Sequence, residues 1–134
     1  MKRVFLLAVG VALVASASAL AAVRAPAVRY VDDRYGAVLT TPKHQALYTW
    51  TAERDLKIHC TGACSQAWRP LYAKGAVPAH VRGVKGTFAT IRRPDGRRQV
   101  TFNRRPVYTY AHEAPEQVLC DNVNGWFVVR LRLR

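Results

Sequence analysis

The segment Leu47-Tyr48-Thr49-Trp50-Thr51-Ala52-Glu53 decides how the rest of the chain is interpreted, because the chain repeats it. The second copy is Val107-Tyr108-Thr109-Tyr110-Ala111-His112-Glu113, displaced by 60 residues. Each copy has two aromatic residues at a spacing of two, so both rings point to the same side of an extended strand. The pattern predicts two equivalent aromatic strands, each followed by a Glu.

The correspondence between the two halves extends beyond these strands. The other matched pairs are Thr41 with Thr101, Cys60 with Cys120 and, after a two-residue deletion, Trp68 with Trp126. A repeat of this length predicts two similar structural units, because one copy alone cannot bury its aromatic face. We therefore predict a single duplicated domain over residues 36–134, with halves at about 36–72 and 87–131.

Short alternating segments between turn residues predict a mostly β fold. In each half a β-hairpin and an aromatic strand contribute to a small antiparallel sheet or sandwich. In the first half the hairpin is expected to pair residues 36–41 with 46–51. In the second half residues 87–92 and 97–102 both alternate, and the turn Arg93-Pro94-Asp95-Gly96 between them predicts the second hairpin. One short helix is expected near 61–69, with Cys64 and Trp68 four residues apart on one face.

The N-terminus has the pattern of a secretory signal peptide over residues 1–21. A basic Met1-Lys2-Arg3 precedes a short apolar run over 4–15, and small residues follow. This pattern predicts cleavage, with 22–35 as an extended lead-in and no transmembrane segment afterwards. No Cys lies near the cleavage region, so a lipid anchor is not expected. The expected location is the periplasm or the cell exterior.

The formal net charge is +13, and loss of Lys2 and Arg3 with the signal would leave +11. A domain this basic is attracted to anionic surfaces such as lipid head groups or acidic polysaccharide. The alternative is that the charge serves only solubility. Arg is spread along the chain and not gathered on one predicted helix, which argues against a specific nucleic-acid reader.

The three Cys residues allow more than one disulfide pairing. In an exported protein Cys60 and Cys64 are a disulfide candidate, which would leave Cys120 as a buried thiol or as a bridge between two chains of a dimer. Pairing of Cys60 with Cys120 is the alternative that the repeat suggests. His59 and Cys120 are the candidate metal ligands, but the spacing fits neither a zinc finger nor a C-x-x-C-H haem site, so no metal or cofactor is expected.

The repeated motif also admits a catalytic and a structural interpretation. Glu53 and Glu113 could form a carboxylate pair for hydrolysis. We expect instead that each accepts hydrogen bonds from backbone N–H groups at its strand end, or pairs with an Arg. No Ser-His-Asp order, Cys-His signature or phosphate-binding Gly loop is evident, so an enzyme is not expected.

The aromatic residues of the motif are expected to form the core. The alternative is an exposed aromatic surface that stacks on a sugar or another ring. The residues concerned are Tyr48, Trp50, Trp68, Tyr108, Tyr110 and Trp126.

The joint order of these motifs resembles that of the bacterial secreted-repeat proteins, often described as predicted lipoproteins, that carry a Y-x-[FWY]-x-x-D motif. The matching segments are 47–53, 60–71, 99–103, 106–113 and 125–129. Both motif acids are Glu where the family pattern has Asp, and the chain lacks a lipidation Cys. The resemblance implies a fold and a compartment but no reaction, because the family has no assigned activity.

The sequence thus predicts an exported, non-catalytic, envelope-associated binding or structural protein with a basic surface for anionic partners. The alternative is a periplasmic redox or metal-handling protein that uses Cys60, Cys64, Cys120 and His residues.

Overall fold

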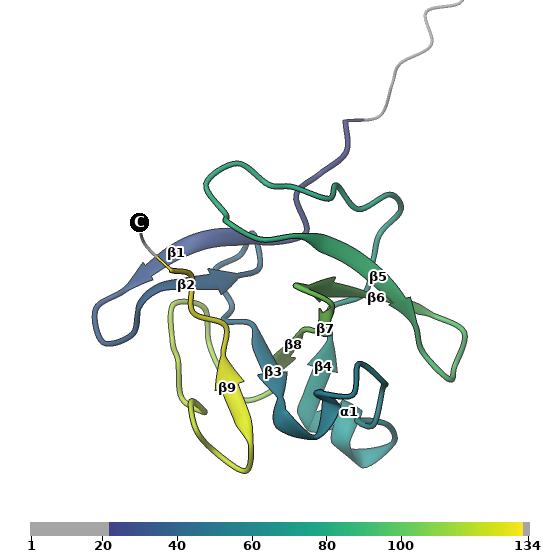
Figure 1. Cartoon of the computed structure of the whole chain (residues 1–134). Coiled ribbons are helices and arrows are strands. Elements are labelled where there is room, and N and C mark those ends of the chain that lie inside the picture. Colours follow the sequence, from purple (N-terminus) through teal and green to yellow (C-terminus); the bar gives the residue numbers. More distant parts are fainter. Residues whose placement is uncertain (1–21, 133–134) are drawn as a thin grey trace, which may run out of the picture.

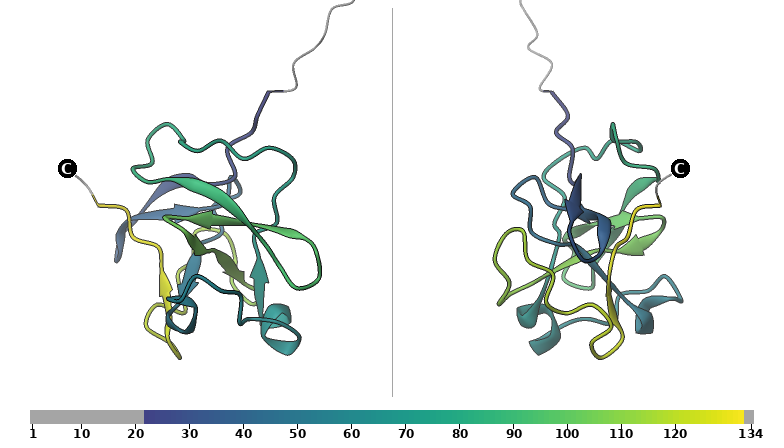
Figure 2. Two further views of the ribbon diagram at one scale, coloured as in Figure 1. Left: turned by 45° about the vertical axis from the view of Figure 1, so that its right-hand side comes forward. Right: turned by 90° about the vertical axis from the view of Figure 1, so that its left-hand side faces the viewer.

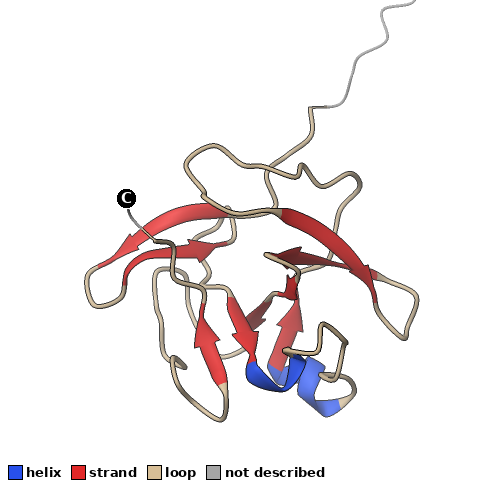
Figure 3. Ribbon diagram, viewed as in Figure 1, coloured by secondary structure: helices blue, strands red, loops and turns tan. Residues whose placement is uncertain are grey.

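A computed structural model of the chain describes residues 22–132, and its fold is mostly β, which confirms the predicted class (Figures 1 and 3). The predicted signal peptide lies outside the described residues. The strands are β1 (Val28–Asp32), β2 (Gly36–Thr40), β3 (Tyr48–Trp50), β4 (Trp68–Pro70), β5 (Phe88–Arg92), β6 (Arg98–Phe102), β7 (Arg105–Pro106), β8 (Tyr108–Tyr110) and β9 (Trp126–Val128). The helices are the 3-10 turn η1 (Thr51–Glu53) and α1 (Ala63–Ala67). Neither is long and apolar enough to cross a membrane.

The strands form two hairpin sheets and one central sheet. β1 pairs with β2, and β5 pairs with β6, which also pairs with β7; every pairing is antiparallel. The central sheet has the strand order β4-β8-β3-β9. In Figure 1 the two hairpins lie at the upper left and upper right, with the central sheet below them, and Figure 2 shows the same arrangement from two further sides.

The central sheet interleaves the two halves of the chain. The aromatic strands β3 and β8 lie side by side, with Tyr48 opposite Tyr108. β4 of the first half then pairs with β8 of the second half, and β9 of the second half pairs with β3 of the first. Each half therefore places its last strand against the aromatic strand of the other half.

Two clusters of buried side chains hold these layers together. One contains the apolar residues of the hairpins and includes Leu39, Phe88 and Phe102. The other contains the aromatic residues of the central sheet, around Tyr48 and Tyr108. Burial of each large side chain contributes about 1.5–3 kcal/mol. All buried members of both clusters fall between residues 27 and 131, so residues 22–132 contain both cores.

Two elements differ from the sequence-based expectation. The segment expected as an extended lead-in contains β1, which pairs with β2 along its whole length. The hairpin expected between residues 36–41 and 46–51 is reduced to the single bridge of Thr40 with Ala46. The reason is visible in β1, where half-buried and exposed residues alternate as in a strand with one packed face.

The helix is also shorter than expected. α1 ends at Ala67, and Trp68 begins β4 instead of continuing the helix, because it pairs with Tyr110 of β8.

Candidate functional site

Two buried Tyr–Glu hydrogen bonds join the halves at the centre of the molecule. The hydroxyl of Tyr48 donates to Oε2 of Glu113 at 2.5 Å, and the hydroxyl of Tyr108 donates to Oε1 of Glu53 at 2.8 Å. All four residues are buried. Each half therefore supplies the hydroxyl that binds the acid of the other half. The repeat placed these four residues at equivalent positions, but no sequence pattern indicated that each hydroxyl binds the acid of the other half.

The same two carboxylates organise the loops that follow them. Oε1 of Glu53 accepts the N–H groups of His59 at 2.8 Å and Cys60 at 3.0 Å. Oε2 of Glu113 accepts the N–H group of Leu119 at 2.8 Å. Neither acid is within salt-bridge distance of an Arg or Lys among the described residues. Each Glu thus closes a loop of six or seven residues that leads to a Cys.

Burial changes the proton affinities of this group. Burial raises the pKa of Glu113, against the opposing effect of the hydrogen bonds from Tyr48 and Leu119. Burial, with the neighbouring acid second in importance, also raises the pKa of Tyr48 and of Tyr108 well above the ordinary range of tyrosine. Both hydroxyls therefore stay protonated at neutral pH and act as donors. With both carboxylates buried, a substrate has no direct access to either one.

The six aromatic residues of the motifs meet in one cluster. Trp50 stacks on Trp126 with ring centroids 5.2 Å apart, Trp126 stacks on Trp68 at 4.0 Å, and Trp68 packs on Tyr110 at 4.8 Å. The two inner rings of this column are buried and the two outer rings are half-buried. Tyr48 and Tyr108 meet the column edge-on. The aromatic residues thus pack mainly on one another.

Sequence reasoning missed a buried polar pair in the second half. Arg93 is 4% exposed and donates from Nη1 to Oε1 of Gln99 at 2.6 Å and from Nη2 to the carbonyl of Cys60 at 2.7 Å. Gln99, which is fully buried, donates from Nε2 to the carbonyl of Val107 at 2.9 Å. The Arg93–Cys60 bond ties the second hairpin to the disulfide loop. The only sequence signal was the position of Arg93 directly before the Pro94-Asp95-Gly96 turn.

The cysteines adopt the first of the predicted pairings. Cys60 and Cys64 form a disulfide with their Cα atoms 5.2 Å apart, and Cys120 is free and buried. Burial, followed by the charge of Glu113, raises the pKa of Cys120, which favours the protonated thiol over the thiolate. His59 makes a 2.7 Å contact from Nε2 to Oδ2 of Asp55. Within residues 22–132, no three His, Cys, Asp or Glu side chains are grouped to hold a metal ion.

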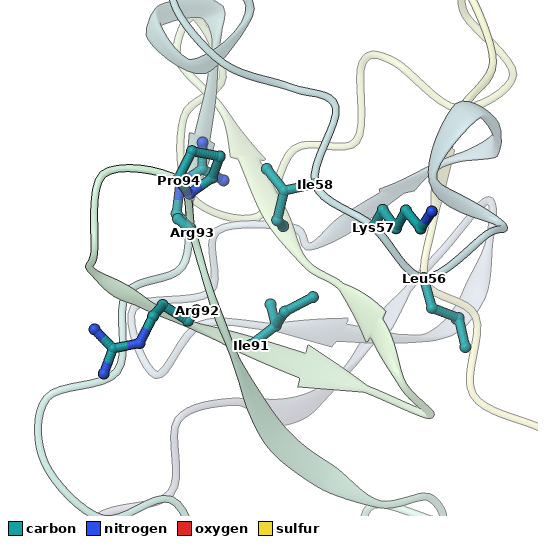
Figure 4. Close-up of a pocket in the computed structure, with 7 residues that line it drawn as sticks. All are labelled: Leu56, Lys57, Ile58, Ile91, Arg92, Arg93 and Pro94. Carbon is teal, nitrogen blue, oxygen red and sulfur yellow. The ribbon is translucent and has the colours of Figure 1, made fainter.

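A shallow groove lies outside the aromatic cluster (Figure 4). One wall is the loop after η1 and the other is the end of β5 with the turn that follows. Its volume is about 370 Å³, and it is lined by Leu56, Lys57, Ile58, Ile91, Arg92, Arg93 and Pro94. Of its three cationic residues, Lys57 and Arg92 are exposed and Arg93 is buried.

The surface cations have few acidic partners. Lys2, Arg3 and Arg134 lie outside the described residues, and among the other 18 Lys and Arg only Arg130 forms a salt bridge there, with Asp121. Five of the eight acidic residues are engaged elsewhere. Glu53 and Glu113 are buried, and three Asp residues accept backbone N–H groups in turns: Asp32 from Arg34 and Tyr35, Asp55 from Lys57, and Asp95 from Arg97.

Comparison of the chain with protein-family models, with curated proteins and with solved structures finds no match in any of the three. The resemblance to the secreted-repeat proteins stays a prediction, and no relative indicates an activity.

Proposed function

We propose that the protein is an exported, non-catalytic module that binds anionic components of the cell envelope through its exposed Lys and Arg side chains. The observation that carries this proposal is the absence of carboxylate partners for 16 of the 18 Lys and Arg in residues 22–132; the other two are Arg130, which pairs with Asp121, and Arg93, which is buried. Unpaired surface charges of one sign create a field that attracts anions over a distance of about 10 Å at moderate salt.

The placement of the cations supports an extended anionic surface as the partner. Exposed cations occur on β1, on β4, on both strands of the second hairpin and on the long connection between β4 and β5; examples are Arg29, Arg69, Arg92, Arg98 and Lys85. Such a distribution suits a partner with many negative groups, such as a lipid head-group layer or an acidic polysaccharide. It suits a single small anion less well, because one small anion contacts few of these side chains.

The buried polar groups support a binding role over a catalytic one. Glu53, Glu113, Tyr48 and Tyr108 satisfy one another and the backbone inside the core. Their arrangement stabilises a rigid scaffold, and the charged residues lie on its outside.

Vesicle and polysaccharide binding tests this proposal. We would use the chain from Ala22 onward, because residues 22–132 contain both cores. We expect it to bind vesicles of phosphatidylcholine and phosphatidylglycerol in equal parts, and an acidic polysaccharide resin, but not vesicles of phosphatidylcholine alone. Raising salt from about 0.1 M to about 1 M shortens the screening length from about 10 Å to about 3 Å and should release the protein. Equal binding to neutral vesicles, or binding that survives high salt, would contradict the proposal.

A further inference from the structure

We propose that the groove between the 56–58 loop and the end of β5 binds to an anionic phospholipid surface, with lipid phosphates at Lys57 on one side and at Arg92 on the other and the first acyl carbons of a lipid over the groove floor. This inference rests on the proposed function, because it assigns that general attraction to one site.

The floor of the groove is apolar surface that the fold does not use. Leu56, Ile58 and Ile91 are half-buried and Pro94 is exposed. None of these four residues belongs to either buried cluster or packs against one. Figure 4 shows Ile58 above Ile91 between the outer lining residues, and each comes from a different wall of the groove. Apolar side chains gathered outside the cores mark a surface that gains free energy when an apolar group covers it.

The two exposed cations of the groove lie on opposite sides of this floor. In Figure 4 the side chains of Arg92 and Lys57 lie to either side of the two Ile residues. The charged side-chain nitrogens of these two residues have no carboxylate oxygen within 4.0 Å among the described residues. Lys and Arg side chains only donate hydrogen bonds, so they fit a ligand that only accepts them, as a phosphodiester does. A peptide would bring unmatched N–H donors as well.

Arg92 has an electrostatic reason to prefer an anion. Its partner in the antiparallel register is Arg98, so two like charges stand directly opposite each other. Such pairs are destabilising. Arg98 turns its guanidinium to the hydroxyl of Thr90 at 3.0 Å, whereas Arg92 makes only a long 3.4 Å contact with the carbonyl of Gly96. A phosphate beside Arg92 would offset this repulsion.

Leu56 is held in the groove at a conformational cost. Its φ is +65°, in the left-handed region that Leu rarely adopts. The N–H group of Leu56 donates to the carbonyl of Glu53 at 3.1 Å, which closes the turn after η1. Gly would adopt this turn more easily than Leu does. Leu at this position instead supplies an aliphatic side chain to the groove.

The repeat supplies an internal comparison. Leu39 and Val100 occupy equivalent places, since Leu39 donates its N–H to the carbonyl of Val129 and Val100 donates to that of Leu71. On this correspondence Arg92 is equivalent to Val31, and at the 60-residue offset Lys57 is equivalent to Gln117. The two exposed cations of the groove therefore have no cationic equivalent in the repeat.

Charge reversal with a matched control tests the site. Lys57→Glu with Arg92→Glu is compared with Arg29→Glu with Lys43→Glu, which reverses two exposed cations outside the groove lining and gives the same net charge. Binding to the equal-part phosphatidylcholine and phosphatidylglycerol vesicles is measured at low salt. We expect the groove variant to bind roughly thirtyfold more weakly and the control variant to lose less than about threefold.

Leu56→Gly separates binding from folding. Gly accepts a φ of +65° without strain, so the melting temperature should not fall by more than about 2 °C. Because the variant also removes apolar contact with the acyl chain, we expect roughly fivefold weaker vesicle binding with every cation retained. Unchanged binding of Leu56→Gly would overturn the proposed contact with the acyl chain.

Two further outcomes would also overturn the inference. If both charge-reversal variants lose affinity equally, the groove is not the site, although the general attraction to anionic surfaces survives. If the unmodified chain self-associates in sedimentation without lipid, and Lys57→Glu with Arg92→Glu abolishes that association, the occupant is a second copy of the chain. Failure of the unmodified chain to bind anionic vesicles at all would instead remove the proposed function.

Discussion

Tyr48 and Glu113 lie 65 residues apart in the sequence and share a buried hydrogen bond of 2.5 Å. The equivalent bond of Tyr108 with Glu53 runs in the opposite direction between the halves. A buried acceptor that loses its donor costs about 1–3 kcal/mol, more than the net gain from making the bond. The two bonds therefore make the halves depend on each other for polar as well as apolar reasons.

Removal of one hydroxyl tests this dependence. Tyr108→Phe takes a donor from Glu53, whose Oε2 already has no hydrogen-bond partner within residues 22–132. We expect a loss of about 2 kcal/mol in the free energy of unfolding, measured by urea denaturation. Tyr110→Phe is the matched control, since Tyr110 is half-buried in the same strand and its change should stay within about 0.5 kcal/mol. An equal loss of unfolding free energy in both variants would show that the Tyr108–Glu53 hydrogen bond contributes no more than the half-buried hydroxyl of Tyr110.

Glu113 should make stability depend on pH in a defined direction. Burial raises the pKa of Glu113 above its ordinary 4.5, so the folded chain binds this proton more tightly than the unfolded chain does. The free energy of unfolding should then fall as pH rises from about 4.5 through the raised pKa. Glu113→Gln cannot ionise, so its stability relative to the unmodified chain should grow over that window. A relative stability that shrinks with rising pH would mean that the ionised form is the favoured one.

The cysteines predict a simple thiol count. One thiol per chain, Cys120, should react with a thiol reagent after unfolding, and three after reduction. In the folded protein Cys120 should react slowly because it is buried. The Cys60–Cys64 link closes a short loop, so Cys60→Ala with Cys64→Ala should cost about 2 kcal/mol in urea denaturation. Detection of no free thiol in unfolded, unreduced protein would indicate a bridge between chains through Cys120.

The interleaved sheet predicts that the two halves recognise each other when separated. The connection between β4 and β5 includes exposed residues at Lys74, Gly75 and Ala76, where the chain can be divided. Fragments 22–75 and 76–134 should each lack fixed structure, and should form the β-rich fold when mixed, as measured by circular dichroism and tryptophan fluorescence. A fragment that folds alone would contradict the interdependence of the halves.

Much of the fold could be predicted from the sequence, because the features concerned are local or repeated. The alternation in residues 87–92 and 97–102, with a Pro-Asp-Gly turn between them, matches the observed hairpin β5–β6. The motif at Tyr48 and Tyr108 indicated two equivalent strands, and these pair with each other. β1 was missed because its pattern Val-Arg-Tyr-Val-Asp is short and only half-buried, so its assignment depends on β2 as a partner.

Less of the candidate site could be predicted. The sequence indicated which aromatic residues and acids belong together, but the crossing of their partners depends on strand order, which no local pattern encodes. Arg93 is a buried cation in a chain that is rich in exposed cations, so the amino-acid composition does not indicate that this Arg is buried. The groove needs the juxtaposition of the 56–58 loop with β5, two segments more than thirty residues apart in the chain.

The strand order β4-β8-β3-β9 also has a consequence for the time at which the chain can fold. β3 lacks both of its sheet neighbours until β8 and β9 have been made, and β9 ends at Val128. We therefore expect a growing chain to stay unfolded on the ribosome until synthesis is nearly complete. Such a chain remains in the extended form that a narrow protein-conducting pore can accept.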